Sequence, residues 1–252
     1  MHIFLVNDDG IGSIGIMALA RAAVAKGHKV SMCAPASQQS AASQRISLAE
    51  PLYVSDFDAN DENITAYAIK GTPADCVRLG LFDLITEPVD ILISGINDGY
   101  NAGTAVYYSG TVGAAREGSM HHLHAIAASI NYHASPEMVE YFAGYVMDVA
   151  EKYISQKVPP LTVLNINAPR LPFEELQPPV YAPLSTGLFL DSYLRRESPR
   201  AGLYFWLEGG ARSETPQEGT DQDMLDKGHI TLTLMGNLQD SRIELPEFWD
   251  EN

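Results

Sequence analysis

Short apolar runs alternate along the chain with stretches in which apolar residues recur at helical spacing. The first run, residues 2–6 (His-Ile-Phe-Leu-Val), stops at Asn7, and small and aliphatic residues follow at helical spacing from Ile14 to Lys26. A short run with β-branched members that ends at Asn, Asp and Gly is typical of a central parallel strand, buried on both faces. The segment is therefore predicted to be a strand, a tight turn and a helix.

The same alternation continues to about residue 167. Strands that alternate with helices predict a largely parallel sheet covered by helices, which is an α/β fold. Further strands are predicted over residues 28–34, 52–57, 64–69, 90–94, 124–129 and 161–167, and further helices over 73–85, 111–120 and 136–155.

The segment after Pro169 differs in composition from the part before it. It is richer in Pro, Gly and charged residues, and its extended segments lie near 204–207 and 230–234. We therefore expect the core to close near residue 167. The chain is divided into a core, residues 1–175, and a C-terminal extension, residues 176–252, which is expected to pack on a partner subunit.

Composition narrows the choice of partner. The chain has 252 residues, 46% of them hydrophobic, and a net charge of −16. Affinity for nucleic-acid polymers depends on Lys and Arg, so DNA and RNA are not expected partners, whereas a small phosphorylated substrate is compatible with this charge. No signal peptide or stretch long enough to span a membrane is seen, so a cytoplasmic location without membrane contact is expected.

Two adjacent carboxylates, Asp8 and Asp9, follow the first predicted strand. Ligands of open α/β sheets bind at the carboxyl ends of such strands. At a separation of about 4 Å and an effective dielectric constant of about 20, two carboxylates repel each other by about 4 kcal/mol. A divalent cation, which prefers oxygen ligands, would offset this repulsion. The alternative is that both residues are solvated turn residues or helix caps, which are common roles of Asp.

The turn after these carboxylates also matches a dinucleotide-binding pattern, Gly10-x-Gly12-x-x-Gly15. In that pattern an acidic residue after the second strand holds a ribose hydroxyl. Here the second strand ends in Cys33-Ala34-Pro35, and two carboxylates would face the pyrophosphate. Both observations argue against a nicotinamide enzyme, although a non-catalytic nucleotide- or dinucleotide-binding module stays open as an alternative function.

Two later segments carry further polar groups to strand and helix ends. Asn97 follows the strand over 90–94, and an Asn oxygen is a suitable additional ligand for Mg²⁺ or Mn²⁺. Ser109 and Thr111 stand at a helix start rich in small residues, where free amides and hydroxyls form an anion pocket. Together with Asp8 and Asp9, this favours phosphate binding over simple helix capping. Thr72-Pro73-Ala74-Asp75, in contrast, is explained as a capping box.

Short motifs at these positions form a recognisable set across nearly the whole chain. They are Asn7-Asp8-Asp9-Gly10, Ser40–Ser43, Gly71-Thr72-Pro73-Ala74-Asp75-Cys76, Ser94-Gly95-Ile96-Asn97, Asn101-x-Gly103, Tyr108-Ser109-Gly110-Thr111-Val112, Leu164-Asn165-Ile166-Asn167, Tyr204-Phe205-Trp206-Leu207 and Thr220-Asp221. As a set they resemble the SurE (survival protein E) family of metal-dependent nucleoside-monophosphate phosphatases.

The resemblance implies a Rossmann-like, three-layer catalytic core and a C-terminal hairpin and helix extension, exchanged between the subunits of a homodimer or homotetramer. It implies hydrolysis of nucleoside 5′- and 3′-monophosphates, with polyphosphate as a further substrate of some members. One divalent ion per subunit, Mg²⁺ or Mn²⁺, would be bound by Asp8, Asp9, Ser40 and Asn97, with Asp8 and Asp9 as the catalytic residues. Asn97, Ser109, Gly110 and Thr111 would contact the substrate phosphate.

The chain departs from the family pattern just before Ser40. Residues 36–39, Ala-Ser-Gln-Gln, replace a stretch that is usually charged and contains arginines. None of the implied metal ligands is affected. We therefore expect the activity to be retained and the substrate preference to differ, with Arg45 as a nearby replacement for the missing basic groups.

Overall fold

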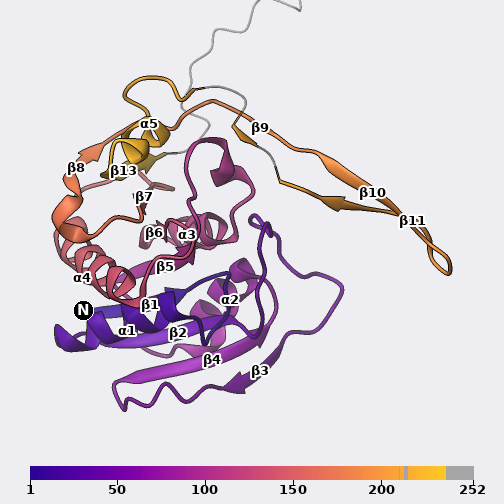
Figure 1. The fold of residues 1–252 in the computed structure, drawn as a ribbon. Coiled ribbons are helices and arrows are strands. Elements are labelled where there is room, and N and C mark those ends of the chain that lie inside the picture. Colours follow the sequence, from indigo (N-terminus) through magenta and orange to yellow (C-terminus); the bar gives the residue numbers. More distant parts are fainter. Residues whose placement is uncertain (210, 213–214, 237–252) are drawn as a thin grey trace, which may run out of the picture.

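A computed structural model of the chain describes residues 1–209, 211–212 and 215–236. Residues 237–252 of the expected C-terminal extension lie outside this description. The ribbon shows a central sheet between helices and a long hairpin that leaves the body of the molecule (Figure 1).

The main sheet has nine strands in the order β3-β4-β2-β1-β5-β6-β7-β13-β8. In this order, the six strands from β4 to β7 run parallel to one another, whereas β3 pairs antiparallel with β4 and β13 pairs antiparallel with β7. The expected α/β fold with a mostly parallel sheet is therefore confirmed. The strands are β1 (His2–Val6), β2 (Lys29–Pro35), β3 (Tyr53–Asp56), β4 (Ile64–Lys70), β5 (Ile91–Asp98), β6 (His124–Ile130), β7 (Val163–Ala168), β8 (Gln177–Tyr181) and β13 (His229–Met235).

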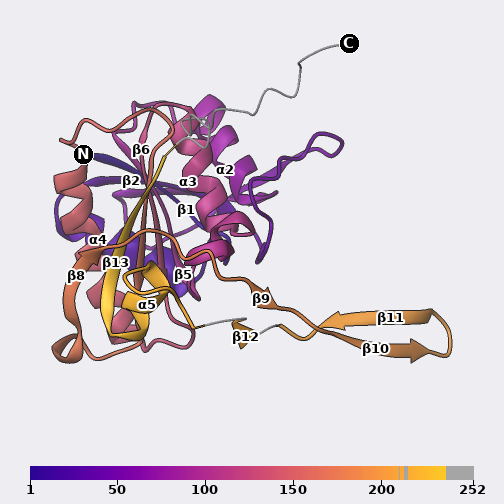
Figure 2. The same cartoon turned by 90° about the horizontal axis from the view of Figure 1, so that it is seen from above.

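Helices cover both faces of this sheet, as the view from above shows (Figure 2). α1 (Ile14–Ala25) and α4 (Pro136–Tyr153) pack on one face, and α2 (Pro73–Leu79) and α3 (Gly110–Met120) pack on the other. Because apolar side chains cover both faces, every residue of β1 is buried, as its apolar run predicts. No helix in the described part of the chain is long and apolar enough to cross a membrane.

Close packing of α1 on β5 explains the third glycine of the dinucleotide-like pattern. A Cβ atom at Gly15 would lie 2.0 Å from the backbone oxygen of Ile96. Only glycine permits this approach of helix to strand. The pattern thus has a packing explanation that requires no bound dinucleotide.

The expectation that the core closes near residue 167 is wrong, because β13 pairs antiparallel with β7 and β8 pairs parallel with β13. The alternating Ile-Thr-Leu-Thr sequence of residues 230–233 predicts a strand, but alternation does not indicate which strand it pairs with. The helix predicted over 73–85 also differs in detail, since α2 ends at Leu79 and a π-helical turn continues over Gly80–Leu84.

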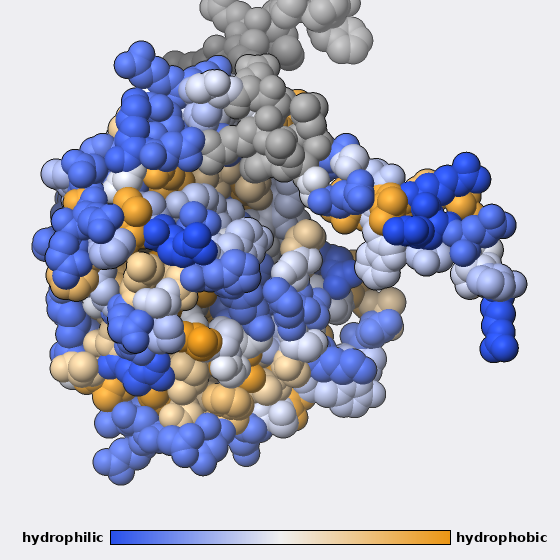
Figure 3. Space-filling view, viewed as in Figure 1, coloured by the Kyte–Doolittle hydropathy of each residue, from blue (hydrophilic) through white to orange (hydrophobic). Residues whose placement is uncertain are grey.

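Four strands of the C-terminal part form the projecting hairpin, here called the arm, and its base. β10 (Tyr193–Ser198) and β11 (Gly202–Leu207) pair antiparallel as a hairpin, and the short strands β9 (Phe189–Leu190) and β12 (Ala211–Arg212) pair at its base. The helix α5 (Asp221–Asp226) packs on β13. Figure 3 shows hydrophobic residues among hydrophilic ones along the projecting arm. Its exposed apolar side chains include Phe205 and Trp206.

Candidate active site

The candidate site lies where β1 and β5 end and α3 begins. β1 and β5 are adjacent and parallel, with Val6 opposite Ser94. This register brings the residues after β1, Asp8 and Asp9, to the level of Asn97 near the end of β5. The order of the strands therefore explains why polar residues far apart in sequence share one edge of the sheet.

Asp8 is a buried carboxylate, 5% exposed. The Thr111 hydroxyl donates a hydrogen bond to its Oδ1 at 2.5 Å. Burial raises the pKa of Asp8 to about 6; the Thr111 hydrogen bond opposes this rise, and the charge of Asp9 adds to it. In the protein alone, ionisation of Asp8 is therefore unfavourable, and a bound cation would make it favourable.

The start of α3 packs directly against Asp8. A Cβ atom at Gly110 would lie 2.9 Å from the Asp8 Cβ atom, so glycine is required for this approach. Ser109 caps the helix, because its Oγ accepts a hydrogen bond from the Val112 amide at 3.1 Å. The first amides of a helix carry partial positive charge, which favours an anion at this point.

Asp9 is partly buried and belongs to the same edge. Its Oδ2 accepts a hydrogen bond from the Asp98 amide at 3.1 Å. Burial raises the pKa of Asp9, the Asp98 amide lowers it, and the charge of the Asp98 carboxylate raises it again. The site thus concentrates negative charge that its own hydrogen bonds only partly offset.

Asn97 presents an oxygen to this edge. Its Nδ2 donates to the Gly99 backbone oxygen at 2.8 Å, which fixes the orientation of the amide. Among the described residues no group donates to Asn97 Oδ1. That oxygen is consequently available to a ligand or to water.

The loop that carries Ser40 is fastened to the site on both sides. The Gln39 amide donates to the Asp8 backbone oxygen at 2.7 Å, and the Ser43 amide donates to the Tyr108 backbone oxygen at 3.0 Å. Ser40 itself is exposed, and its hydroxyl forms no hydrogen bond within the described part of the chain. The structure therefore brings the loop next to Asp8 but leaves the Ser40 side chain uncommitted.

Buried polar groups hold the loop between Asn97 and α3. The Asn101 amide donates to Asn167 Oδ1 at 2.9 Å, and the Gly103 amide donates to Asp221 Oδ2 at 2.7 Å. Asp221 is fully buried and also accepts from the Ser185 amide at 2.8 Å. The C-terminal part of the chain thus fixes the loop that leads into the helix start.

The donor set suits a hard cation. In the described ranges no group of three or more His, Cys, Asp or Glu side chains is placed to hold a metal ion. A metal here would therefore be bound by two carboxylates with neutral oxygens such as Asn97 Oδ1. Oxygen-only donors with a carboxylate pair are typical of Mg²⁺ and Mn²⁺ rather than zinc.

Comparison with known proteins identifies the family. The family model described as "Survival protein SurE" matches residues 3–188. The chain belongs to the SurE family. The 5′-nucleotidase SurE of Solidesulfovibrio magneticus is 40% identical and covers 92% of this chain and 90% of its own length. The 5′-nucleotidase SurE of Thermosipho africanus is 36% identical with the same coverage. The SurE crystal structure from Aquifex aeolicus has a TM-score of 0.80, with 29% identity and coverage of 97% of each chain.

Not every polar group at the edge of this SurE chain was expected from sequence. Asp8, Asp9, Gly110 and Thr111 come together, and Asn97 lies at the level of Asp9. The part played by Asp98, whose amide binds Asp9, was missed. The only sequence signal is its place directly after Asn97, where the strand end must turn towards the site.

Proposed function

We propose that this chain is a metal-dependent phosphatase that hydrolyses nucleoside 5′-monophosphates to nucleoside and phosphate. The observation that carries the proposal is the buried Asp8 carboxylate, held by Thr111 at the start of α3 and adjacent to Asp9. The substrate class is supported by the names of the SurE relatives. We further propose that the protein acts in the cytoplasm as a homodimer or homotetramer.

The residues that would hold the ion are Asp8, Asp9, Ser40 and Asn97. When bound, Mg²⁺ or Mn²⁺ supplies a Lewis acid that polarises the phosphoryl group and lowers the pKa of a bound water. The raised pKa values of Asp8 and Asp9 support this assignment, because a cation stabilises both charged carboxylates.

The protein groups at the start of α3 have separate tasks in this proposal. The Thr111 hydroxyl donates its one hydrogen bond to Asp8 Oδ1 and so orients the carboxylate. The Ser109 hydroxyl accepts from the Val112 amide, and its own proton is available for a phosphoryl oxygen. With the amide of Gly110, it stabilises the charge that develops on the phosphoryl group during in-line attack.

The alternative, a non-catalytic nucleotide-binding module, makes different predictions. It requires nucleotide binding that survives removal of metal and does not depend on Asp8. The contact between Gly15 and Ile96 already explains one of its signature glycines by packing. The carboxylate pair beside the turn would also repel a pyrophosphate in the absence of a cation.

The test is phosphate release from a panel of esters with Mn²⁺, with Mg²⁺ and after chelation. The panel contains 5′- and 3′-nucleoside monophosphates, polyphosphate and phenyl phosphate. We expect metal-dependent release from 5′-monophosphates, reduced at least a hundredfold by Asp8→Asn or Asp9→Asn. Asp83→Asn, the same charge change at an exposed position, is the control. Wild-type turnover in the Asp8 and Asp9 variants, or no release with either metal, would contradict the proposal.

A further inference from the structure

A pocket of about 300 Å³ opens beside Asp9 on the face of the sheet covered by α1 and α4. Its walls come from the first residues of α1 and α4 and from the ends of β5 and β6. Because Asp9 belongs both to this pocket and to the carboxylate pair, a ligand with its phosphate at the pair can place its remaining atoms in the pocket.

The walls of this pocket are largely apolar. Ile96 and Ile130 line it from the sheet, and Val139 lines it from α4. Ile14, the first residue of α1, adds a side chain that is 59% exposed. Apolar walls that converge beside a charged centre suit a planar, uncharged ring system.

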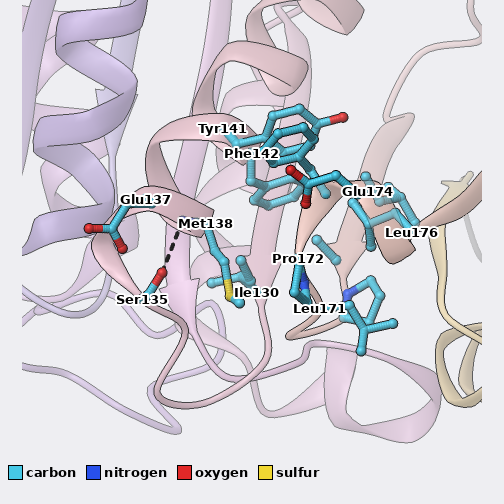
Figure 4. Close-up of a pocket in the computed structure, with 14 residues that line it drawn as sticks. Ile130, Ser135, Glu137, Met138, Tyr141, Phe142, Leu171, Pro172, Glu174 and Leu176 are labelled. Carbon is cyan, nitrogen blue, oxygen red and sulfur yellow. Dashed lines mark hydrogen bonds between the residues drawn. The ribbon is translucent and has the colours of Figure 1, made fainter.

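A second pocket, of about 250 Å³, shares Ile130 with the first pocket (Figure 4). Aromatic and aliphatic residues of α4 and of the segment after β7 surround it, and Glu137 and Glu174 also line it. None of the proposed metal or phosphate ligands lies among its lining residues. It therefore has no link to the phosphate end of a substrate, whereas the first pocket has one through Asp9.

Asp98 is one of the polar residues of the first pocket, whose lining also contains Asp9, Ser13, Gln38 and His133. The Asp98 backbone amide binds Asp9, and the Asp98 Oδ1 accepts a hydrogen bond from the His133 amide at 3.0 Å. The carboxylate is thus held in place while it stays exposed to the pocket. A carboxylate repels phosphate but accepts hydrogen bonds from hydroxyl groups, as acidic residues do from a ribose.

We propose that this pocket binds the nucleoside half of the substrate, with the base against Ile14 and Ile96 and the ribose hydroxyls donating to Asp98. The inference rests on the proposed phosphatase function and makes Asp98 a residue that determines specificity. It assigns the pocket to the neutral, hydroxylated part of the ligand, which carries an aromatic ring.

The first test compares adenosine 5′-monophosphate, its 2′,3′-dideoxy analogue and phenyl phosphate as substrates. Ala134→Phe fills the pocket, and Asp98→Asn removes the charged acceptor while keeping its size. We expect each variant to lower kcat/KM for adenosine monophosphate about tenfold more than it lowers that for phenyl phosphate, which has no ribose and only a small ring. In Asp98→Asn, the preference for the ribose over the dideoxy sugar should be lost.

Leu171→Phe, which adds bulk to the second pocket, is the matched control and should change neither rate. Equal losses for the nucleotide and phenyl phosphate, or no loss in either variant, would overturn the assignment of the pocket. Unfolding midpoints measured for all three variants identify any that fails to fold, and Asp98→Asn tests the proposal independently of Ala134→Phe.

A second test does not depend on catalysis. Calorimetric titration of adenosine into the metal-free wild-type protein should give saturable binding that Ala134→Phe weakens at least tenfold. Absence of binding would overturn the inference even if the protein is a phosphatase. Conversely, failure to release phosphate from any ester would contradict the proposed function, and the titration would still decide whether the pocket takes a nucleoside.

Discussion

The Thr111 hydroxyl and the Asp8 carboxylate lie 2.5 Å apart, at the start of α3 and the end of β1. They are separated by 103 residues in the sequence, and both are buried. The bond joins the start of a helix to the end of the central strand.

Removal of the Thr111 hydroxyl should release Asp8. Thr111→Val keeps the volume of the side chain but leaves Asp8 Oδ1 without its donor. We expect phosphatase activity to fall by about ten- to a hundredfold, as is usual when a group that orients a metal ligand is lost. Kinetic assays and metal titrations measure the effect. Thr111→Ser, which keeps the hydroxyl, should restore most of the activity, and a fully active Thr111→Val would contradict the prediction.

The charge of Asp8 should destabilise the metal-free protein. Its pKa is raised from 3.8 to about 6, so the folded state binds the proton more tightly than the unfolded state does. Stability from this group is therefore present at low pH and is lost as the pH rises from about 4 to 6. Asp8→Asn should remove this loss and stabilise the metal-free protein at pH 7 by about 1–3 kcal/mol. Urea unfolding with chelator at several pH values tests this.

Replacement of glycine by alanine should lower activity at Gly110 and raise stability at Gly144. A Cβ atom at Gly110 would press on Asp8, so Gly110→Ala should displace the carboxylate and lower activity. A Cβ atom at Gly144, inside α4, meets no atom within 4 Å, so Gly144→Ala should stabilise the protein by about 0.5–1 kcal/mol. Thermal unfolding and activity assays on both variants distinguish the two cases. Equal behaviour would contradict the proposed contact.

Asp75 should stabilise the protein only above acidic pH. Burial alone raises its pKa, but hydrogen bonds from Ser47 and Thr72 outweigh this and hold the pKa below its usual value of 3.8. The stabilisation is therefore complete above that value and is lost as the pH falls through the lowered folded-state pKa. Asp75→Asn should cost about 1–2 kcal/mol at pH 7 and progressively less below pH 3.8. A cost independent of pH in urea unfolding would show this to be wrong.

The projecting hairpin should be an intersubunit contact. A two-stranded hairpin is marginally stable by itself, and Phe205 and Trp206 of β11 are 54% and 65% exposed. We expect the protein to sediment as a dimer or tetramer, and the double change Phe205→Lys and Trp206→Lys to reduce the assembly. Phe82→Lys, at an exposed aromatic residue of the core, is the control. A wild-type monomer in sedimentation would contradict this expectation.

Local patterns predicted much of this molecule. The apolar run before Asn7 indicated a buried central strand, and the Thr72–Asp75 spacing indicated a capping box; both are confirmed. These features depend on neighbouring residues, so the sequence records them directly. The pairing of β13 with β7 depends on which distant strand offers a free edge, and the alternation of residues 230–233 contains no such information.

The candidate site shows the same division. The positions of Asp8, Asp9 and Asn97 at strand ends could be predicted, because parallel strands end at one edge of a sheet. The hydrogen-bond partner of each group could not. The Thr111 hydroxyl donates a hydrogen bond to Asp8 Oδ1, and this pairing depends on the packing distance between α3 and β1. The pocket beside Asp9 forms only where the starts of α1 and α4 come together in the fold, so no short sequence motif predicts it.

The hydrogen bond between Asp221 and Gly103 determines when, during synthesis of the chain, the loop that contains Gly103 can become fixed. The two residues are 118 positions apart, and Asp221 belongs to one of the last helices to be synthesised. On the ribosome, β1, β5 and α3 can assemble long before this carboxylate emerges. The loop between Asn97 and α3 therefore lacks its hydrogen bond to Asp221 until α5 has been synthesised. A nascent chain truncated before α5 would contain every proposed ligand, but the loop between them would not be fixed.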